Sequence, residues 1–218
     1  MAAPQETGTK ARLLQAGRKV FSEHGLENAT IREICSLAGA NVAAVNYHFG
    51  SKEQLYIAVL QDYIKREHAR HPHDEGVTPQ SDPKDRLRAY IRSFLLQTLG
   101  DGDPENDRLG KLLTQEYVEP SKYFSEIFEK QCRPGFELLK DIVRQFLPSH
   151  NETTVSSCAS SVIGQCVLFD IGKEAISRMT PELTLRESNI ERITDFIVEF
   201  SLGGIARLNS QLASAEKA

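Results

Sequence analysis

Residues 30–55 read TIREICSLAGANVAAVNYHFGSKEQL, and this stretch decides the fold. Thr30 and Glu33 have the spacing of a capping box, in which the hydroxyl accepts a backbone N–H and the carboxylate reaches back. Gly39 suits a turn that needs an unusual backbone conformation, and Asn41 is a favoured residue for beginning a helix. Two helices joined by this short turn predict a helix-turn-helix unit.

The second of these helices is too short to be stable alone, so packing must hold it in place. We expect Val42 and Val45 to face inward. The outward side chains are small or polar: Asn41, Ala43, Ala44, Asn46, Tyr47 and His48. Amides pair with adenine edges, and alanine methyls can contact thymine methyls. Tyr47, His48 and Lys52 suit phosphate oxygens, as do the N–H groups of a helix that begins at Ser51.

Helical periodicity continues on both sides of this unit. Thr9 is expected to cap the first helix, Gly25 to end it, and residues 9–65 to form four helices. The polar stretch 68–84 contains three prolines and is predicted to be a connection. Longer helices are expected at 83–99, 105–117, 120–147, 152–178 and 187–211, with breaks at 101–104 and 148–151. Pro134 should kink or split one of them. Because no segment alternates with period two, the predicted fold class is all-α.

The composition excludes several classes of protein. The chain has 218 residues, a net charge of −4, 40% hydrophobic and 26% charged residues, an ordinary globular balance. This composition excludes four classes: collagen-like proteins, wholly disordered chains, membrane helix bundles and uniformly basic nucleic-acid-coating proteins. Residues 1–70 hold nine Lys and Arg against seven Asp and Glu, so the first third is slightly basic and the rest is acidic. A modest basic patch is thus expected at the helix-turn-helix.

No targeting signal, membrane span or metal site is expected. The N-terminus MAAPQETGTK has no apolar core, and the apolar run 162–171 is shorter than a span of about 20 residues. The four cysteines lack C-x-x-C spacing, which favours a reducing cytoplasm and no disulfide. The spacing of His68, His71, His73 and Asp74 matches no metal family, so we expect neither metal nor cofactor. Burial of Cys35 in a core, and packing roles for Cys158 and Cys166, are favoured over redox sensing.

Residues 30–55 resemble the DNA-binding signature of TetR-family transcriptional regulators. The preceding AGRKVFSEHG, residues 16–25, resembles the first helix of that family. Within the signature, AGANVAAVNYHFGSK at 38–52 resembles the CecR-like branch. So do EYVEPSKYF at 116–124 and SSVIGQCVLF at 160–169.

The resemblance implies a cytoplasmic, sequence-specific DNA-binding regulator, with a small-molecule effector releasing a repressor from a near-palindromic double-stranded operator. It implies a DNA-binding domain at 1–67, a connection at 68–84 and an effector-binding and dimerisation domain at 85–218. The residues implied to contact DNA are Thr30, Arg32, Asn41, Ala43, Ala44, Asn46, Tyr47, His48 and Lys52. Many family members have a glycine where this chain has Ala43 and Ala44, so single base contacts are not carried over.

The larger domain is implied to hold an effector pocket and a homodimer interface formed by the last two helices. Phenylalanines on its helices are either plain core or the lining of an apolar pocket. The candidates for the pocket are Phe94, Gln115, Glu116, Phe128, Arg133, Gln165 and Phe169. Small residues that suit close helix packing, together with positions on the last helix, give the interface candidates Ser157, Ser161, Gly164, Ile197, Phe200 and Gly204.

Other functions stay open from the residues alone. A helical enzyme is one, although the sequence contains no G-x-S-x-G, H-E-x-x-H, Walker or G-x-G-x-x-G motif. A protein-interaction adaptor is another. In either case Tyr47 would pack against the first helix, and His48 would be a cap or a surface residue. Activation instead of repression is also open, since the sign depends on where the operator lies.

Overall fold

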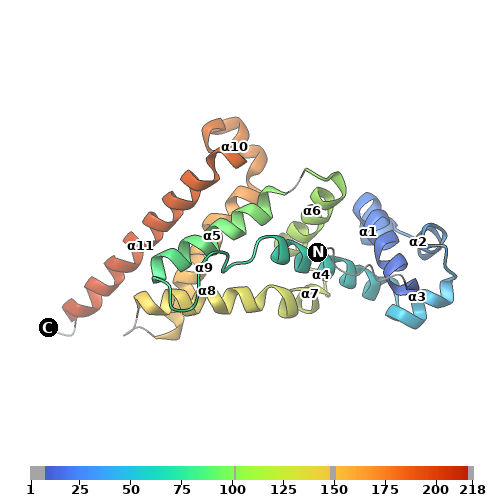
Figure 1. Ribbon diagram of the computed structural model, residues 1–218, viewed down its shortest axis with the longest axis horizontal. Helices are drawn as coiled ribbons and strands as arrows, with labels where there is room; N and C mark the ends of the chain where they lie inside the picture. The colour runs from blue at the N-terminus through green and yellow to red at the C-terminus, as the bar shows by residue number, and fades with distance from the viewer. Residues whose placement is uncertain (1–7, 101, 148–150, 216–218) are drawn as a thin grey trace. The chain divides into compact units, whose positions relative to one another are not determined.

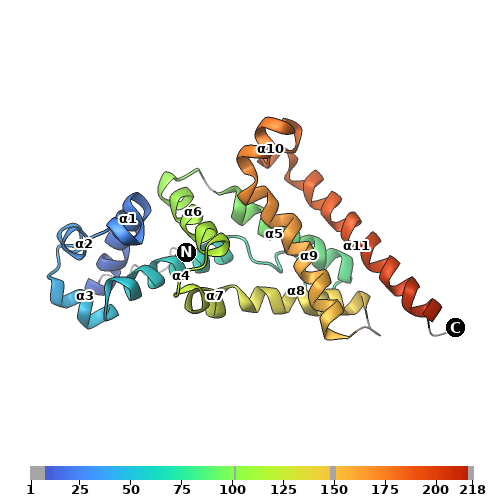
Figure 2. The ribbon, with the colours of Figure 1, turned by 180° about the vertical axis from the view of Figure 1, so that it is seen from behind.

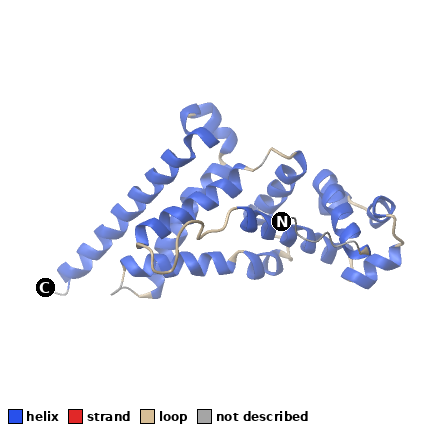
Figure 3. Cartoon of the chain, in the orientation of Figure 1, coloured by secondary structure: helices blue, strands red, loops and turns tan. Residues whose placement is uncertain are grey.

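The computed structural model describes residues 8–100, 102–147 and 151–215, with side chains to residue 211. Within those ranges every regular element is helical, which confirms the predicted all-α class (Figure 3). Parts of the breaks expected at 101–104 and 148–151 fall outside the described residues. The α-helices are α1 (Thr9–Asn28), α2 (Ile31–Ala38), α3 (Val42–Phe49), α4 (Lys52–Arg70), α5 (Pro83–Leu99), α6 (Pro104–Val118), α7 (Phe124–Gln131), α8 (Arg133–Phe146), α9 (Glu152–Ile171), α10 (Lys173–Met179) and α11 (Ile190–Ala215).

Several helix ends differ from the sequence expectation, each for a local reason. Thr9 is the first helical residue of α1, and the capping position is Gly8, which has no side chain. Gly25 interrupts α1 with φ of 68°, as its expected role at a helix end requires, but helical structure resumes to Asn28. The helix expected at 120–147 is split, because Pro134 lies in the first turn of α8, where no N–H is needed. The helix expected at 152–178 is also divided, by Gly172 between α9 and α10.

The chain forms two compact units that interleave along the sequence. Unit 1 comprises residues up to Arg66 together with Gly100–Gln131, and unit 2 comprises Glu67–Leu99 with Cys132–Ala218. Unit 1 thus contains α1, α2, α3, most of α4, α6 and α7 (Figure 1). The helices α6 and α7 fall within 85–218, the stretch assigned by role to the effector domain, yet they pack with the N-terminal helices. That division by role stays a prediction.

Unit 1 is held together along α1. Its residues Leu13, Val20 and Phe21 are buried, and α2, α3 and α6 all pack against this helix. Phe21 meets Tyr56 of α4 edge to face, with ring centroids 5.3 Å apart. On α6, Glu105 and Asn106 both contact the Arg18 guanidinium of α1, at 3.0 and 3.1 Å. The helix-turn-helix is therefore supported by a scaffold drawn from two separate stretches of sequence.

Unit 2 has its own core among α5, α8, α9 and α11. The helices α5 and α9 pack against each other, and each of them packs against both α8 and α11 (Figure 2). The helix α9 contributes Val155, Ala159, Val162 and Cys166 to that core. Contrary to the expectation from its apolar run, α9 is long and apolar enough, by length and composition, to cross a membrane. Core helices pass the same test, and α9 has a face buried in the core of unit 2.

Candidate nucleic-acid interface

The start of α2 confirms half of the predicted capping box. The Thr30 hydroxyl accepts the backbone N–H of Glu33 at 3.2 Å. The Glu33 carboxylate does not reach back to Thr30. It lies 3.1 Å from Nε2 of His24 on α1 instead. Since that contact joins two helices, Glu33 fixes the angle of α2 against α1 in addition to its place in the first turn.

The turn between α2 and α3 is built as its sequence predicts. Gly39 has φ 58° and ψ 43°, the left-handed conformation that favours glycine, and its N–H closes the end of α2. Asn41 then begins α3, because its side-chain oxygen accepts the N–H of Ala44 at 2.9 Å. The Asn41 side chain is thus occupied as a cap, whereas the sequence placed it in the DNA-contacting set.

Packing through Val45, the single fully buried residue of α3, holds this helix. Two polar contacts hold the neighbouring helices. Nε of Arg12 on α1 donates to the carbonyl of Ala38 at the end of α2, at 3.0 Å. The Lys52 ammonium on α4 donates to the carbonyls of Ala29 and Glu27, at 3.1 and 3.4 Å. Lys52 thus ties the start of α4 to the α1–α2 link, and the phosphate contact expected of it stays a prediction.

The outer face of α3 is open to solvent. Tyr47 is 85% exposed, which rules out the alternative that it packs against the first helix. Ala43 and Asn46 are exposed too, while Ala44 and His48 are partly covered. His48 lies edge-on against Tyr47, with ring centroids 4.9 Å apart. Ala43 and Ala44 each lie three or four positions before two of Asn46, Tyr47 and His48, so these side chains form one continuous surface of α3.

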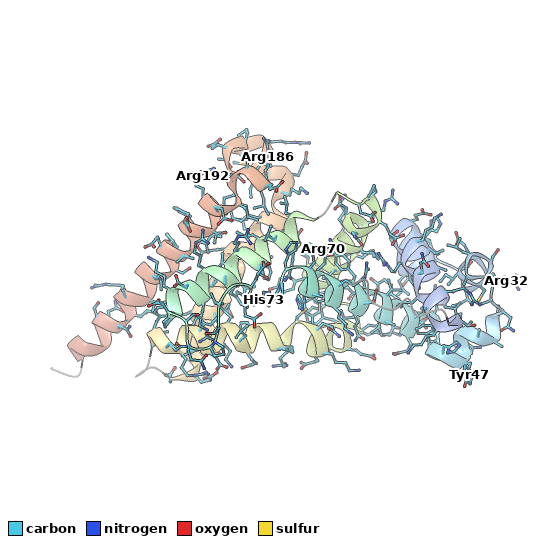
Figure 4. All side chains as sticks on the ribbon, in the orientation of Figure 1. Arg32, Tyr47, Arg70, His73, Arg186 and Arg192 are labelled. Atoms are coloured by element: carbon cyan, nitrogen blue, oxygen red, sulfur yellow. The ribbon has the colours of Figure 1, made fainter. Side chains whose placement is uncertain are left out.

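Arg32 supplies an exposed cation on the neighbouring helix. Its guanidinium makes no hydrogen bond or ion pair with the described part of the chain, and it lies with Tyr47 in the helix-turn-helix (Figure 4). Thr30, in contrast, already accepts a hydrogen bond through its hydroxyl. The interface therefore combines a free cation, a phenol, an amide and methyl groups, which together can bind phosphates and base edges.

The candidates for an effector pocket are divided between the two units. Gln115, Glu116 and Phe128 belong to unit 1, whereas Phe94, Arg133, Gln165 and Phe169 belong to unit 2. Glu116 is buried and fully engaged, accepting from Ser121 Oγ at 2.7 Å and Ser121 N at 3.2 Å, and from the Tyr56 hydroxyl at 3.4 Å. Gln165 donates to Ser201 Oγ at 3.0 Å and so ties α9 to α11.

A shallow depression of about 310 Å³ lies elsewhere in unit 2. It is lined by Glu75, Val77, Asp85, Arg88, Ala89 and Arg92. Its two arginines are already paired: Arg88 with Glu191 and Asp195, and Arg92 with Glu191 and Glu75. The depression is therefore a charged surface feature and has none of the predicted pocket residues in its lining.

The predicted interface residues are mostly exposed. Ser157, Ser161 and Gly164 lie on the open side of α9, and Gly204 and Phe200 lie on the open side of α11. Ile197 does not belong with them, because it is only 2% exposed and packs in the core of unit 2. Phe196, which the sequence analysis did not select, is 67% exposed and stacks on Phe200 with centroids 6.0 Å apart. The four-residue spacing of Phe196 and Phe200 could have identified Phe196 from the sequence, because side chains four apart share one face of a helix.

Comparison with known proteins supports the resemblance found in the sequence, for both the N-terminal and the C-terminal part of the chain. Residues 13–59 match the family described as bacterial regulatory proteins, tetR family, and residues 83–205 match the C-terminal domain of the HTH-type transcriptional dual regulator CecR. The CecR of Shigella flexneri is 30% identical over 215 residues, covering 91% of this chain and 93% of its own length.

One further match is to a short stretch of the sequence, and another is a similarity in three-dimensional structure. The transcriptional repressor NicS of Pseudomonas putida is 42% identical over 59 residues, 27% of this chain and 28% of its own. A solved structure of the transcriptional regulator FadR from Bacillus subtilis, in complex with stearoyl-CoA, is similar with a TM-score of 0.65 and 14% identity. That match covers 88% of this chain and 97% of the FadR chain, and shows a common fold.

Proposed function

The chain belongs to the TetR family of bacterial transcriptional regulators, with a C-terminal domain of the CecR type, and from this premise we propose that it is a repressor. As a homodimer in the cytoplasm, it binds a near-palindromic operator through two helix-turn-helix units. A small-molecule effector then releases it. The observation that carries the DNA-binding part is the open face of α3, where Asn46 and Tyr47 are exposed, together with the exposed Arg32 of α2, whose guanidinium has no partner among the described residues.

The first test is selection of genomic DNA fragments by the purified protein, with elution in a salt gradient and sequencing. A shared near-palindromic element supports the proposal. Arg32→Ala should lower the affinity for all DNA sequences by a similar factor. It should also reduce the salt dependence of DNA binding by the amount that corresponds to about one phosphate contact. Asn46→Ala should instead reduce the discrimination between operator and non-operator DNA.

Arg108→Ala is the matched control, because Arg108 is an exposed arginine of unit 1 that lies on α6, outside the helix-turn-helix. Its substitution should leave both operator affinity and salt dependence unchanged. If Arg32→Ala and Asn46→Ala bind the operator as tightly as wild type, α3 is not the reading helix. If no fragment is retained at low salt, the DNA-binding proposal fails altogether.

The dimer is proposed to form through the open faces of α9 and α11. Phe196 and Phe200 offer a large apolar contact there, which a monomer leaves in water. The small residues Ser157, Ser161 and Gly164 on α9 allow a second helix to approach closely. Each subunit would then bring one reading helix to one half-site, so the two-fold symmetry of the operator mirrors that of the protein.

Effector release requires the ligand to bind two conformations with different affinity. A 100-fold loss of operator affinity corresponds to about 2.7 kcal/mol of differential binding. The phenylalanines of unit 2 favour an amphiphilic or aromatic effector. The FadR structure contains stearoyl-CoA, so acyl-CoA esters of several chain lengths are suitable first probes.

The sign of regulation is tested separately from DNA binding. Relatives include a protein described as a dual regulator, several repressors and an activator. A reporter driven by the selected promoter should be de-repressed when the gene for this protein is deleted. Reduced expression after deletion would assign activation.

A further inference from the structure

Val42 is the first residue of α3, and its side chain is 47% exposed. The spacing to Val45 predicted that both valines face inward, but only Val45 is fully buried. The side chains of a helix lean toward its N-terminus, so the valine in the first turn extends past the layer that Val45 occupies. Val42 therefore presents its methyl groups at the leading end of the helix.

This exposed valine continues the face that contains the proposed base-reading residues. Val42 and Asn46 are four positions apart, and Ala43 and Asn46 are three apart, so the three side chains lie on one side of α3. A single exposed valine is unremarkable on a protein surface. Its position matters here because the neighbouring amide has to approach base edges for the proposed function to hold.

The chemistry of the major groove restricts what a valine can recognise there. Phosphates and base edges offer charges, donors and acceptors, which a valine cannot pair. The one apolar group on the groove floor is the 5-methyl of thymine. Val42 therefore matches a single feature of the DNA surface.

We propose that Val42 packs against the 5-methyl group of a thymine in each operator half-site and makes the protein prefer a T·A pair at that position. The inference rests on the proposed function, since it needs a specific operator. It adds a specificity-determining residue that the sequence analysis placed in the core.

The test removes that methyl group alone. Each thymine of the selected operator is replaced in turn by deoxyuridine, in both half-sites, and the Kd is measured by fluorescence anisotropy at fixed salt. Burial of one methyl-sized group corresponds to about fourfold in affinity, so substitution in both half-sites should weaken wild-type binding about 15-fold at one position. Val42→Ala should bind the thymine and deoxyuridine operators with nearly equal Kd.

Leu37→Ala is the matched control. Leu37 is 51% exposed, close to the value for Val42, but lies on α2. This variant should keep the preference for thymine that Val42→Ala loses. Circular dichroism should show both variants folded, because each change removes atoms from a side chain that is about half exposed.

Four results would overturn the inference while leaving the proposed function intact. The first is an operator without thymine in its half-sites, and the second is equal wild-type affinity for every deoxyuridine operator. The third is retained discrimination in Val42→Ala, and the fourth is equal loss of discrimination in Leu37→Ala. Binding of the wild-type protein to the unmodified operator is measured first. If it does not bind, the proposed function fails together with this inference.

Discussion

Lys52 shows how a residue suited to one role can perform another. A lysine at the start of α4 fits a phosphate contact, but its ammonium donates to two carbonyls at the α1–α2 link. The backbone carbonyls that it caps belong to the end of α1, where Gly25 has already broken the regular ladder. The sequence identifies the positive charge of Lys52 and its place near the helix-turn-helix. Which groups the ammonium contacts depends on how α1 ends.

Lys52→Met should therefore lower the free energy of unfolding, by about 1 kcal/mol, because two hydrogen bonds are lost and the aliphatic stem is kept. Urea titration followed by circular dichroism measures this change. Arg32→Met is the comparison, at an exposed arginine without a partner in the described part of the chain, and it should leave the stability within about 0.5 kcal/mol of wild type. Equal stability of the two variants would mean that the two hydrogen bonds of Lys52 do not stabilise the fold, and only the predicted DNA contact would remain as its role.

His73 carries a prediction about pH. Burial, with the neighbouring His68 adding a like charge, lowers the pKa of His73 to about 4. Its ring stacks on Tyr90 with centroids 4.3 Å apart, and Nδ1 lies 3.1 Å from Ser93 Oγ. The unfolded chain binds a proton at this residue below about pH 6.5, while the folded chain does so only near pH 4.

Protonation therefore favours unfolding, and stability should fall as the pH drops from about 6.5 to 4. Between pH 7 and pH 5 the loss due to His73 should be up to about 2 kcal/mol. His73→Phe keeps a ring against Tyr90 and should flatten this slope. His24→Gln, at an exposed histidine paired with Glu33, should retain it. Thermal or urea unfolding at several pH values decides between these outcomes.

At the scale of elements, the helix-turn-helix was predictable because its signals are local. Thr30, Gly39 and Asn41 each satisfy a backbone requirement within a few residues of their own position. The exposure of Val42 and the pairing of Glu33 with His24 were not predictable in this way. Both depend on packing between α1, α2 and α3, which the periodicity of one helix does not contain.

The same contrast applies to the longer helices. Pro134 was expected to kink or split the stretch 120–147, and it lies in the first turn of α8 just after the split. Gly172 gave no comparable signal, yet α9 ends there with its N–H bonded to the carbonyl of Leu168 at 2.9 Å. A glycine inside an apolar helical pattern is compatible with continuation, so tertiary packing decides.

Gly39→Ala tests the turn between α2 and α3. An alanine at φ 58° is strained, and no heavy atom lies within 4 Å of the added Cβ, so backbone strain is the only cost. The free energy of unfolding should fall by about 1 kcal/mol. Gly39→Asn should cost less, because asparagine tolerates the left-handed conformation. Equal stability of all three proteins would contradict the assigned turn geometry.

At the scale of the whole molecule, the proposed regulation requires a second subunit, which the sequence indicated only through resemblance. Small residues on α9 and Phe200 on α11 were identified, and both are exposed, whereas Ile197 is core. The distinction between an inward and an outward isoleucine on an amphipathic helix depends on its rotation. That rotation is fixed by α5 and α9, which pack against α11.

Phe200→Glu should convert the proposed dimer to a monomer, because a carboxylate placed in an apolar interface loses its hydration. Light scattering coupled to size exclusion measures the mass. Operator affinity should fall strongly, since one reading helix cannot bind two half-sites at once. Tyr117→Glu, at an aromatic residue of unit 1 that is also exposed, should remain dimeric. An unchanged mass for Phe200→Glu would contradict the proposed interface.

The interleaving of the two compact units constrains how this protein can be recombined. The helices α6 and α7 arise after α5 in the chain, but they complete the unit that contains the helix-turn-helix. A chimera joined at the end of α4 would separate Arg18 from its partners Glu105 and Asn106 and expose the α1 face that α6 covers. To exchange the operator preference of this regulator with that of a relative, the graft should carry residues 100–131 together with the N-terminal helices. Gene fusions that respect the domain order of the sequence would instead cut through a folded body.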